Sequence, residues 1–160
     1  MPPPLSDPDL ERFMREALAE AEAAGHAGDY PIGAVVVRGG EVVSRGRAGA
    51  RTTHSQLAHA ELAALLPLTG DEWSGRNDDA VLFTTMEPCP MCLGATVMMD
   101  IEHVVFALHD PLAGMRDMLE IPYVARHIQT YRGGVLADDA LELLGRLRPE
   151  MLAYLSRGTE

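Results

Sequence analysis

Two short motifs constrain this chain more than any other feature of its sequence: His59-Ala60-Glu61 and, further along, Pro88-Cys89-Pro90-Met91-Cys92. Together they supply one imidazole, two thiols and one carboxylate, and the chain has no cysteine outside the second motif. Three protein ligands with a fourth position left to water are the usual arrangement of a catalytic zinc site. The motifs therefore predict a fold that brings two distant segments together around one metal ion.

Each of these four side chains has a role that fits its chemistry. His59, Cys89 and Cys92 are the candidate ligands of one Zn2+ per chain, because two cysteines three positions apart can both reach an ion from the first turn of a helix. Glu61 is not needed as a ligand, so it is the candidate catalytic residue that carries a proton between water and substrate.

Two alternatives to a catalytic zinc site stay open. A closed structural site needs a fourth ligand, for which His54, His103 and His109 are candidates by composition, although none has a customary spacing. A disulfide or a redox-active pair is the other way to use Cys-x-x-Cys.

The length and the N-terminal sequence bound the class of protein. A chain of 160 residues is expected to form one domain, 1–160, with residues 1–5 disordered. No apolar run approaches the roughly 20 residues of a membrane span, and the first residues lack the basic-then-apolar layout of a signal peptide. We therefore expect a cytoplasmic protein that does not contact membranes and whose cysteines stay reduced.

The net charge of −11 argues against nucleic acid as a partner. The chain has no lysine, and its densest group of arginines, Arg45, Arg47 and Arg51, is expected on a loop. An acidic protein repels phosphate backbones, so a nucleic acid is an unlikely partner.

Hydrophobic periodicity and turn residues divide the chain into alternating helices and strands. Ser6-Asp7-Pro8-Asp9 is typical of a helix start, and Gly39-Gly40 is typical of a two-residue hairpin turn. The expected helices are 6–25, 58–66, 90–100, a short helix within 111–126, and 137–156 with a bend near Pro149. The expected strands are 32–38, 41–45, 80–85, 102–108 and 127–131.

This order predicts an α/β fold: a three-layer α/β/α sandwich around a mixed five-stranded sheet. A hairpin comes first, and strand–helix alternation follows it. His59 is then expected at the start of the second helix and the two cysteines at the start of the third, where helix dipoles favour thiolates.

From about Phe13 to Leu144 the chain resembles the cytidine deaminase-like superfamily. The resemblance rests on the two motifs, on the strand 31–37, and on Val104-Val105-Phe106-Ala107 with Asp110, followed by Gly133-Gly134-Val135-Leu136. These segments are similar to the branch that holds guanine deaminases, yeast-type cytosine deaminases and bacterial tRNA adenosine deaminases. The resemblance implies a zinc-dependent aminohydrolase, parallel last strands joined by a crossover helix, and a homodimer.

Two departures from that family pattern concern the substrate. The branch usually carries an Asn that binds the base, where this chain has Ala48, and it usually carries Asp-Pro-Thr or similar where this chain has Ser55-Gln56-Leu57. The expected substrates are water and a free heterocyclic base, such as guanine, cytosine, isocytosine or an aminotriazine like ammeline. The two departures favour a less usual base, including triazines. A tRNA-specific adenosine deaminase is the first alternative, and a non-catalytic zinc-stabilised interaction module is the second.

Six residues are candidates for binding the substrate. The resemblance implies that the backbone N–H of Ala60 binds a ring carbonyl. Asp110 either contacts the substrate amino group or caps a turn before Pro111, and His54 and Gln56 either replace the missing Asn or are solvated loop residues. Tyr123, Tyr131 and Tyr154 are candidates for closing over the pocket. The candidate substrate-binding residues are Ala60, Ile32, His54, Gln56, Glu87 and Asp110.

Overall fold

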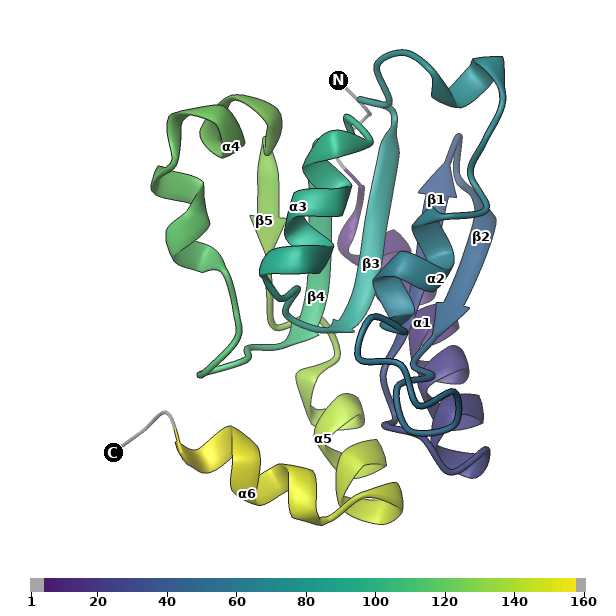
Figure 1. The fold of residues 1–160 in the computed structure, drawn as a ribbon, viewed down its shortest axis with the longest axis vertical. Coiled ribbons are helices and arrows are strands. Elements are labelled where there is room, and N and C mark those ends of the chain that lie inside the picture. The colour runs from purple at the N-terminus through teal and green to yellow at the C-terminus, as the bar shows by residue number, and fades with distance from the viewer. Residues whose placement is uncertain (1–4, 158–160) are drawn as a thin grey trace.

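A mixed sheet of five strands forms the centre of the molecule (Figure 1). The computed structural model describes residues 5–157, so the predicted disorder of residues 1–5 lies almost wholly outside the described residues. The strand order is β2-β1-β3-β4-β5. The strands are β1 (Gly33–Arg38), β2 (Glu41–Arg47), β3 (Ala80–Met86), β4 (His103–Leu108) and β5 (Thr130–Arg132).

Strand directions follow the family pattern. β1 pairs antiparallel with β2 and β3, whereas β3, β4 and β5 run parallel. The parallel pairing of β4 with β5 requires a crossover, which the segment 109–129 provides with a 3-10 helix, η2 (Arg116–Glu120), and a short α-helix.

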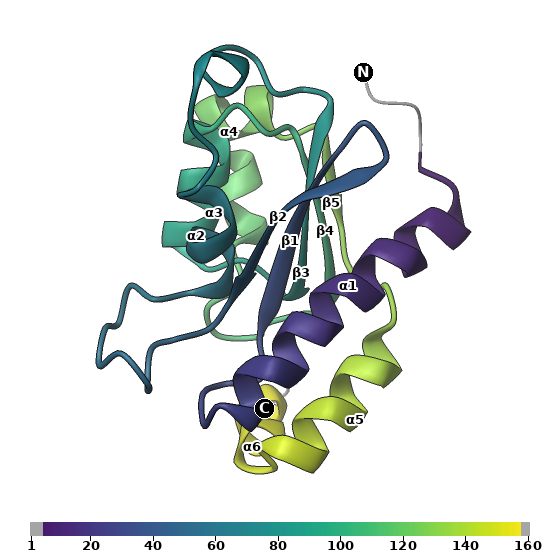
Figure 2. The same cartoon turned by 90° about the vertical axis from the view of Figure 1, so that its right-hand side faces the viewer.

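Helices cover both faces of the sheet and complete the predicted three-layer sandwich. α1 and α5 lie on one face, while α2, α3 and α4 lie on the other (Figure 2). The helices are α1 (Asp7–His26), α2 (Ala60–Leu65), α3 (Pro90–Met98), α4 (Pro122–His127), α5 (Ala137–Leu147) and α6 (Glu150–Ser156), and a second 3-10 helix is η1 (Asp71–Trp73). None of the helices within residues 5–157 has the length and apolar character that a bilayer span requires.

Burial of the strands explains the sequence pattern. Every residue of β3 and β4 is buried, because helices cover both of their faces, and their sequences are continuous apolar runs apart from Thr84, Thr85 and His103. β2 lies at the sheet edge, and its residues alternate between exposed and partly buried as far as Gly46. One core layer, which includes Met14 and Phe83, fills the α1/α5 side.

Gly46 permits an unusually close approach between β2 and α2. A Cβ atom at Gly46 would lie 2.1 Å from the carbonyl oxygen of Ala60 and 2.4 Å from the backbone nitrogen of Ala64. This contact seats the first turn of α2, and therefore His59 and Glu61, directly against the edge strand.

Most predicted elements are confirmed within one or two residues, and two predictions are wrong: the start of the last strand and the single closing helix. His127 belongs to α4 rather than to the last strand, which begins only at Thr130. The segment 137–156 is two helices, since α5 ends at Leu147 and Pro149 precedes the first residue of α6. The second helix is also shorter than predicted, because His59 is its N-cap in an extended conformation.

Candidate active site

The two motifs meet beside the carboxyl ends of β3 and β4, where loops leave an α/β sheet and ligands commonly bind. His59 is the N-cap of α2, and Glu61 lies in the first turn of that helix. Cys89 is the N-cap of α3, which begins at Pro90, and Cys92 lies in its first turn. Proline at the first helical position fixes the entry into α3, so both sulfurs face the same point.

The three candidate ligand atoms have the spacing that a zinc ion requires. Nδ1 of His59 lies 3.6 Å from Sγ of Cys89 and 3.5 Å from Sγ of Cys92. A tetrahedral zinc with bonds of about 2.3 Å to sulfur and about 2.0–2.1 Å to nitrogen separates these atoms by about 3.5 Å. His59, Cys89 and Cys92 form the one cluster of metal-ligating side chains among residues 5–157, and a fourth protein ligand is missing from it.

Hydrogen bonds within this cluster shift the pKa values of its members in a way that favours binding of a cation. A hydrogen bond with Cys92, and then one with His59, lowers the pKa of Cys89 to about 4, although burial opposes the change. The hydrogen bond with Cys89 raises the pKa of His59, and the hydrogen bond with Cys89 together with burial raises that of Cys92. The cluster therefore favours a thiolate at Cys89, the form of cysteine that binds a cation.

Glu61 is a buried carboxyl at the wall of this cluster. It is 4% exposed; Thr84 Oγ1 donates a hydrogen bond to its Oε1 at 3.2 Å, and Cys92 Sγ lies 3.5 Å from its Oε2. Burial raises the pKa of Glu61, so the carboxyl holds a proton more readily than an exposed glutamate. This is the property that a proton carrier needs near neutral pH.

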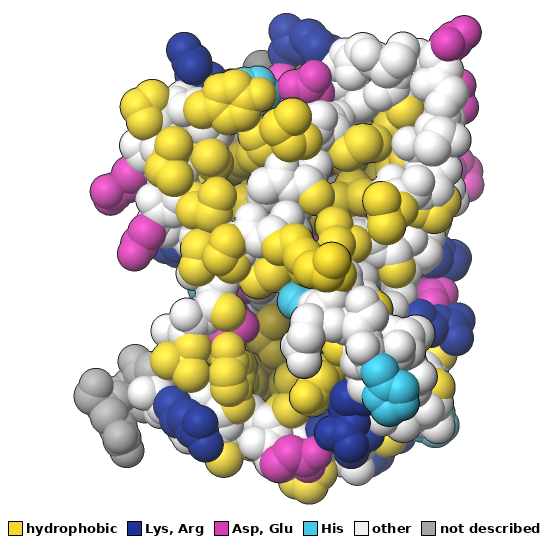
Figure 3. Space-filling model, viewed as in Figure 1, with side chains coloured by type: hydrophobic (Ala, Val, Ile, Leu, Met, Phe, Trp, Pro, Cys, Tyr) yellow, Lys and Arg dark blue, Asp and Glu magenta, His cyan; other side chains and the backbone are white. Residues whose placement is uncertain are grey.

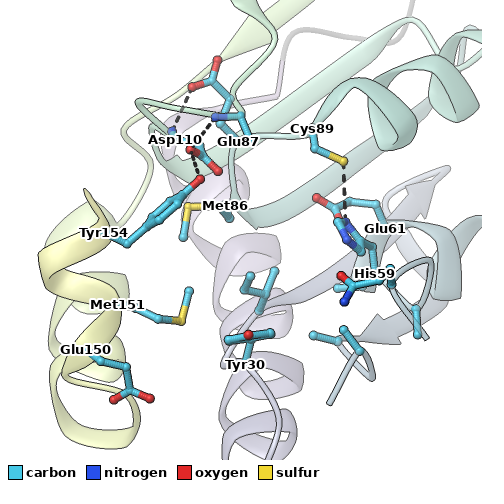
Figure 4. Close-up of a pocket in the computed structure, with 17 residues that line it drawn as sticks. Tyr30, His59, Glu61, Met86, Glu87, Cys89, Asp110, Glu150, Met151 and Tyr154 are labelled. Carbon is cyan, nitrogen blue, oxygen red and sulfur yellow. Dashed lines mark hydrogen bonds between the residues drawn. The ribbon is translucent and has the colours of Figure 1, made fainter. Parts of the chain in front are cut away.

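A cavity of about 410 Å³ opens over His59 and Glu61 (Figure 4). The loop 48–58 forms one wall, and the C-terminal helix α6 lies across from it and closes the other side. Figure 3 shows the surface hollowed between α6 and the body of the domain. The lining residues are Tyr30, Ile32, Ala48, Ala50, Gln56, Ala58, His59, Ala60, Glu61, Met86, Glu87, Cys89, Asp110, Ala113, Glu150, Met151 and Tyr154.

Five of the six predicted substrate-binding residues line this cavity: Ala60, Ile32, Gln56, Glu87 and Asp110. His54 does not, because its loop turns outward there, with φ of 54° and an exposed side chain. Ala48 lies in the wall with its methyl group where the family pattern has an amide.

Protein donors already occupy Glu87. Its carboxylate accepts hydrogen bonds from Tyr131 Oη at 3.0 Å and from the backbone N–H of Asp110 at 3.1 Å, and His109 Nδ1 lies 3.4 Å away. Glu87 is only 5% exposed, so it orients the segment after β4. Of the three tyrosines considered for closing the pocket, Tyr131 therefore acts through Glu87, and Tyr123 is 47% exposed on α4.

Tyr154 joins α6 to the rim of the cavity. Its hydroxyl donates a hydrogen bond of 2.8 Å to Oδ1 of Asp110 (Figure 4). Burial, and then this hydrogen bond, raises the pKa of Tyr154 to about 12, so the phenol stays protonated and keeps donating. Glu150 and Met151 enter the lining with it, and sequence patterns gave no signal for these two residues.

The cavity is acidic. Four carboxyl groups line it, those of Glu61, Glu87, Asp110 and Glu150, and no arginine does. His59 is the single basic side chain in the lining, and it is a candidate metal ligand.

Comparisons with known proteins agree with this geometry. The family model of the cytidine and deoxycytidylate deaminase zinc-binding region matches residues 7–108. A tRNA-specific adenosine deaminase of Streptococcus pyogenes is 34% identical over 141 residues, covering 86% of this chain and 89% of that protein. A tRNA(Ile)-lysidine synthase of Deinococcus radiodurans is 40% identical over 144 residues, but this chain spans only 24% of its length.

Solved structures share the fold. A structure from studies of tRNA:A34 deaminases has a TM-score of 0.72 at 31% identity and covers 83% of this chain and 99% of its own. The guanine deaminase of Bacillus subtilis has a TM-score of 0.57 at 32% identity, covering 71% of this chain and 69% of its own. The similarities therefore reach both tRNA-directed and free-base deaminases.

Proposed function

The chain belongs to the family of the cytidine and deoxycytidylate deaminase zinc-binding region, and we propose that it releases ammonia hydrolytically from a free heterocyclic base. The proposed substrates are guanine, cytosine, isocytosine and aminotriazines such as ammeline. One observation carries this choice over RNA: the cavity is closed on one side by α6 and lined by four carboxyl groups without an arginine.

The proposed reaction replaces an exocyclic amine with oxygen: the base and water give the oxo-base and ammonia. His59, Cys89 and Cys92 would hold one zinc ion, which supplies Lewis acidity and makes water a nucleophile at neutral pH. Glu61 takes one proton from the attacking water and delivers it to the ring nitrogen. It then takes the remaining proton from the hydroxyl on the ring carbon and delivers it to the amine, so the C–N bond breaks, the carbonyl forms and ammonia leaves. Thr84 engages Oε1, so we assign proton carriage to Oε2, which faces the ligand cluster.

The negative charge of the cavity favours a neutral free base over a substrate that carries a phosphate group. A phosphate within a few ångströms of Glu150 or Asp110 would be repelled, and no arginine in the lining would compensate. A base carries N–H groups, which can donate hydrogen bonds to the carboxylates of Glu150 and Asp110 and to the amide oxygen of Gln56. The volume of about 410 Å³ lies within the range of small-molecule sites.

Recognition of the base is expected to differ from the family pattern, because Ala48 stands where the family usually has a base-binding Asn. A methyl group there makes no hydrogen bond, so part of the base edge must be read by Gln56, Asp110 and the backbone of Ala60. Losing one designed hydrogen bond can change substrate preference by large factors. This supports a base other than the usual ones, including triazines.

A tRNA-specific adenosine deaminase is the second candidate. It is favoured by the curated Streptococcus relative, whose length the chain covers almost completely. RNA binding needs phosphate contacts, however, and the protein carries a net charge of −11. The non-catalytic zinc module is less well supported, because a structural site has no use for a buried Glu61.

Ammonia release decides among these functions. We would screen the zinc-loaded protein with guanine, cytosine, isocytosine, ammeline, melamine, the matching nucleosides and an anticodon stem-loop RNA. Glu61→Gln is the control: it should retain zinc and lose about 10²-fold or more in kcat. Activity confined to the RNA refutes the free-base proposal. Unchanged activity in Glu61→Gln refutes the mechanism, and zinc binding with no ammonia from any substrate favours the interaction module.

We also propose a cytoplasmic homodimer, whose interface is the apolar face over α2, α3 and α4. Hydrophobic side chains gather there in Figure 3, and Leu66 and Met98 are each 73% exposed. Large exposed apolar patches commonly mark protein contacts. Light scattering should give twice the monomer mass, and Leu66→Glu with Met98→Glu should give the monomer mass. A wild-type monomer refutes the dimer.

A further inference from the structure

A buried carboxylate in the turn after α1 is not explained by the chemistry above. Asp29 is 0% exposed and lies at the end of the Ala27–Gly28 connection, next to the cavity residue Tyr30. Its Oδ1 accepts a hydrogen bond of 2.8 Å from the backbone N–H of Tyr30. Its Oδ2 accepts three: from the backbone N–H groups of Arg51 at 3.0 Å and Thr52 at 2.8 Å, and from Thr52 Oγ1 at 2.9 Å.

Amide and hydroxyl donors alone hold this charge. None of the ion pairs among residues 5–157 includes Asp29. Burial by itself would raise the pKa of Asp29, but the hydrogen bonds from Thr52, Tyr30 and Arg51 outweigh it and lower the pKa. The carboxylate therefore stays ionised and keeps all four donors at neutral pH.

The segment that Asp29 holds is a wall of the cavity. Arg51 and Thr52 lie within the loop 48–58, whose base is closed by a 2.9 Å hydrogen bond from the N–H of Gly49 to the carbonyl of Ala58. This loop contributes Ala48, Ala50, Gln56 and Ala58 to the lining and leads directly into His59. Loops have few other restraints, so one buried anchor can set the position of the whole wall.

The opposite wall is tied to the same turn. The guanidinium of Arg148 donates hydrogen bonds to the carbonyl oxygens of Gly28 and Asp29. Arg148 directly precedes Pro149 and α6, which supplies Glu150, Met151 and Tyr154 to the cavity. The turn 28–30 thus contacts the supports of both walls.

We propose that Asp29 is a positioning residue of the active site: its carboxylate fixes the segment 49–53 and thereby the distance between the loop wall and α6. The expected effect on KM rests on the proposed function. The expected effect on the position of the loop does not depend on any substrate. Asp29 touches neither the candidate zinc ligands nor Glu61, so removing it should impair binding of the base more than the chemical step.

Four variants separate positioning from general stability. Asp29→Ala removes all four acceptor contacts. Asp29→Asn keeps an oxygen for Arg51 and Thr52 and loses the contact with Tyr30, so its effect should be smaller than that of Asp29→Ala but still measurable. Thr52→Val removes the hydroxyl donor and keeps the backbone N–H donor. Glu22→Ala is the matched control, an acid at the same end of α1 that pairs with Arg146 on the surface.

One measurement reports on the loop, one on the metal site and one on the reaction. Brief trypsin treatment of the folded protein, with the cuts mapped by mass spectrometry, reports how often the exposed Arg51–Thr52 bond is released. Zinc content per chain reports on the metal site. Michaelis constants are measured with guanine, isocytosine and ammeline.

For Asp29→Ala we expect cleavage after Arg51 at least about tenfold faster than in wild type, one zinc per chain, and a KM raised about tenfold or more with kcat within about threefold. Asp29→Asn and Thr52→Val should fall between it and wild type, and Glu22→Ala should match wild type.

Wild-type cleavage and wild-type KM in Asp29→Ala overturn the proposal, as does a fall in kcat with KM unchanged. If Asp29→Ala does not fold, wild-type cleavage at Arg51 in both Asp29→Asn and Thr52→Val overturns it. If the wild-type protein releases no ammonia from any base, the proposed function fails, and the cleavage pattern still decides the role of Asp29.

Discussion

Replacing Gly46 with alanine should displace α2 and damage the candidate zinc site from a distance. The added Cβ would lie 2.1 Å from the Ala60 carbonyl oxygen, 2.4 Å from the Ala64 nitrogen and 2.9 Å from the Ala63 carbonyl carbon. All three are backbone atoms, so no side chain can rotate away. Heavy atoms in contact prefer separations of about 3.5 Å, so α2 must move from β2 by roughly 1 Å or more.

The size of the effect follows from this displacement. Overpacking of a core contact typically costs about 1–3 kcal/mol, which lowers Tm by roughly 2–12 °C in a domain of this size. The helix that moves begins after His59 and carries Glu61 in its first turn. A misplacement of about 1 Å can cost about 10²-fold in rate. We therefore expect Gly46→Ala to lose stability, zinc affinity and most activity together.

Gly94→Ala is the control for this experiment. Gly94 lies in α3, two positions after Cys92, and a Cβ there meets no atom within 4 Å. Alanine in a helix interior is more stable than glycine by about 0.5–1 kcal/mol, so this variant should gain slightly in Tm and keep its zinc. Thermal unfolding, zinc content and ammonia release of the two variants test the reasoning. A Gly46→Ala protein with wild-type Tm, zinc and activity would show that the close contact between β2 and α2 does not set the site.

Three further predictions concern removal of the metal, the hydrogen bond that joins α6 to the rim of the cavity, and the dependence of stability on pH. Removing zinc with a chelator should abolish ammonia release and lower Tm by several degrees, both restored by added Zn2+, because a ligand that binds only the folded state stabilises it; full activity of the metal-free protein would contradict the assignment of His59, Cys89 and Cys92. Tyr154→Phe removes the hydrogen bond to Asp110 and should raise KM about tenfold with little change in zinc content, since a bond to a charged group contributes about 1.5–3 kcal/mol; an unchanged KM would mean that α6 does not need this bond to close the cavity. The lowered pKa of Asp29 gives stability that is present above its unfolded value of about 3.9 and is lost as pH falls through the folded value. The free energy of unfolding of wild type should therefore approach that of Asp29→Asn below about pH 4, in denaturant titrations across that range, and a constant difference between the two would exclude this linkage.

Local patterns predicted much of the fold because short-range sterics and hydrogen bonding decide it. Ser6 caps α1 as its sequence indicates, with the N–H of Asp9 donating to its hydroxyl. The apolar runs of β3 and β4 identified strands buried on both faces. The same rules were wrong at His127, where the helical turn of α4 continues into a range that looks like a strand, and this competition is settled by packing.

Chemistry at fixed spacing was likewise predictable from the sequence. A Cys-x-x-Cys pair at a helix start and a His-x-Glu pair at another can converge on one ion, and the distances of 3.5 and 3.6 Å among their atoms are those of a tetrahedral zinc site. His54 fails this kind of prediction because its place in the cavity depends on the path of a loop, and that path turns it outward.

The sequence by itself determined the candidate metal ligands, the proposed proton carrier and the layer architecture, since each depends on residue type and on spacing within one turn or one strand. Only the tertiary structure decided the walls of the cavity. Tyr154 reaches Asp110, 44 positions earlier, and Arg148 reaches Asp29, 119 positions earlier, and no periodicity encodes such contacts. They exist because α5 and α6 pack back onto the domain, where burial of apolar surface selects one arrangement of distant segments.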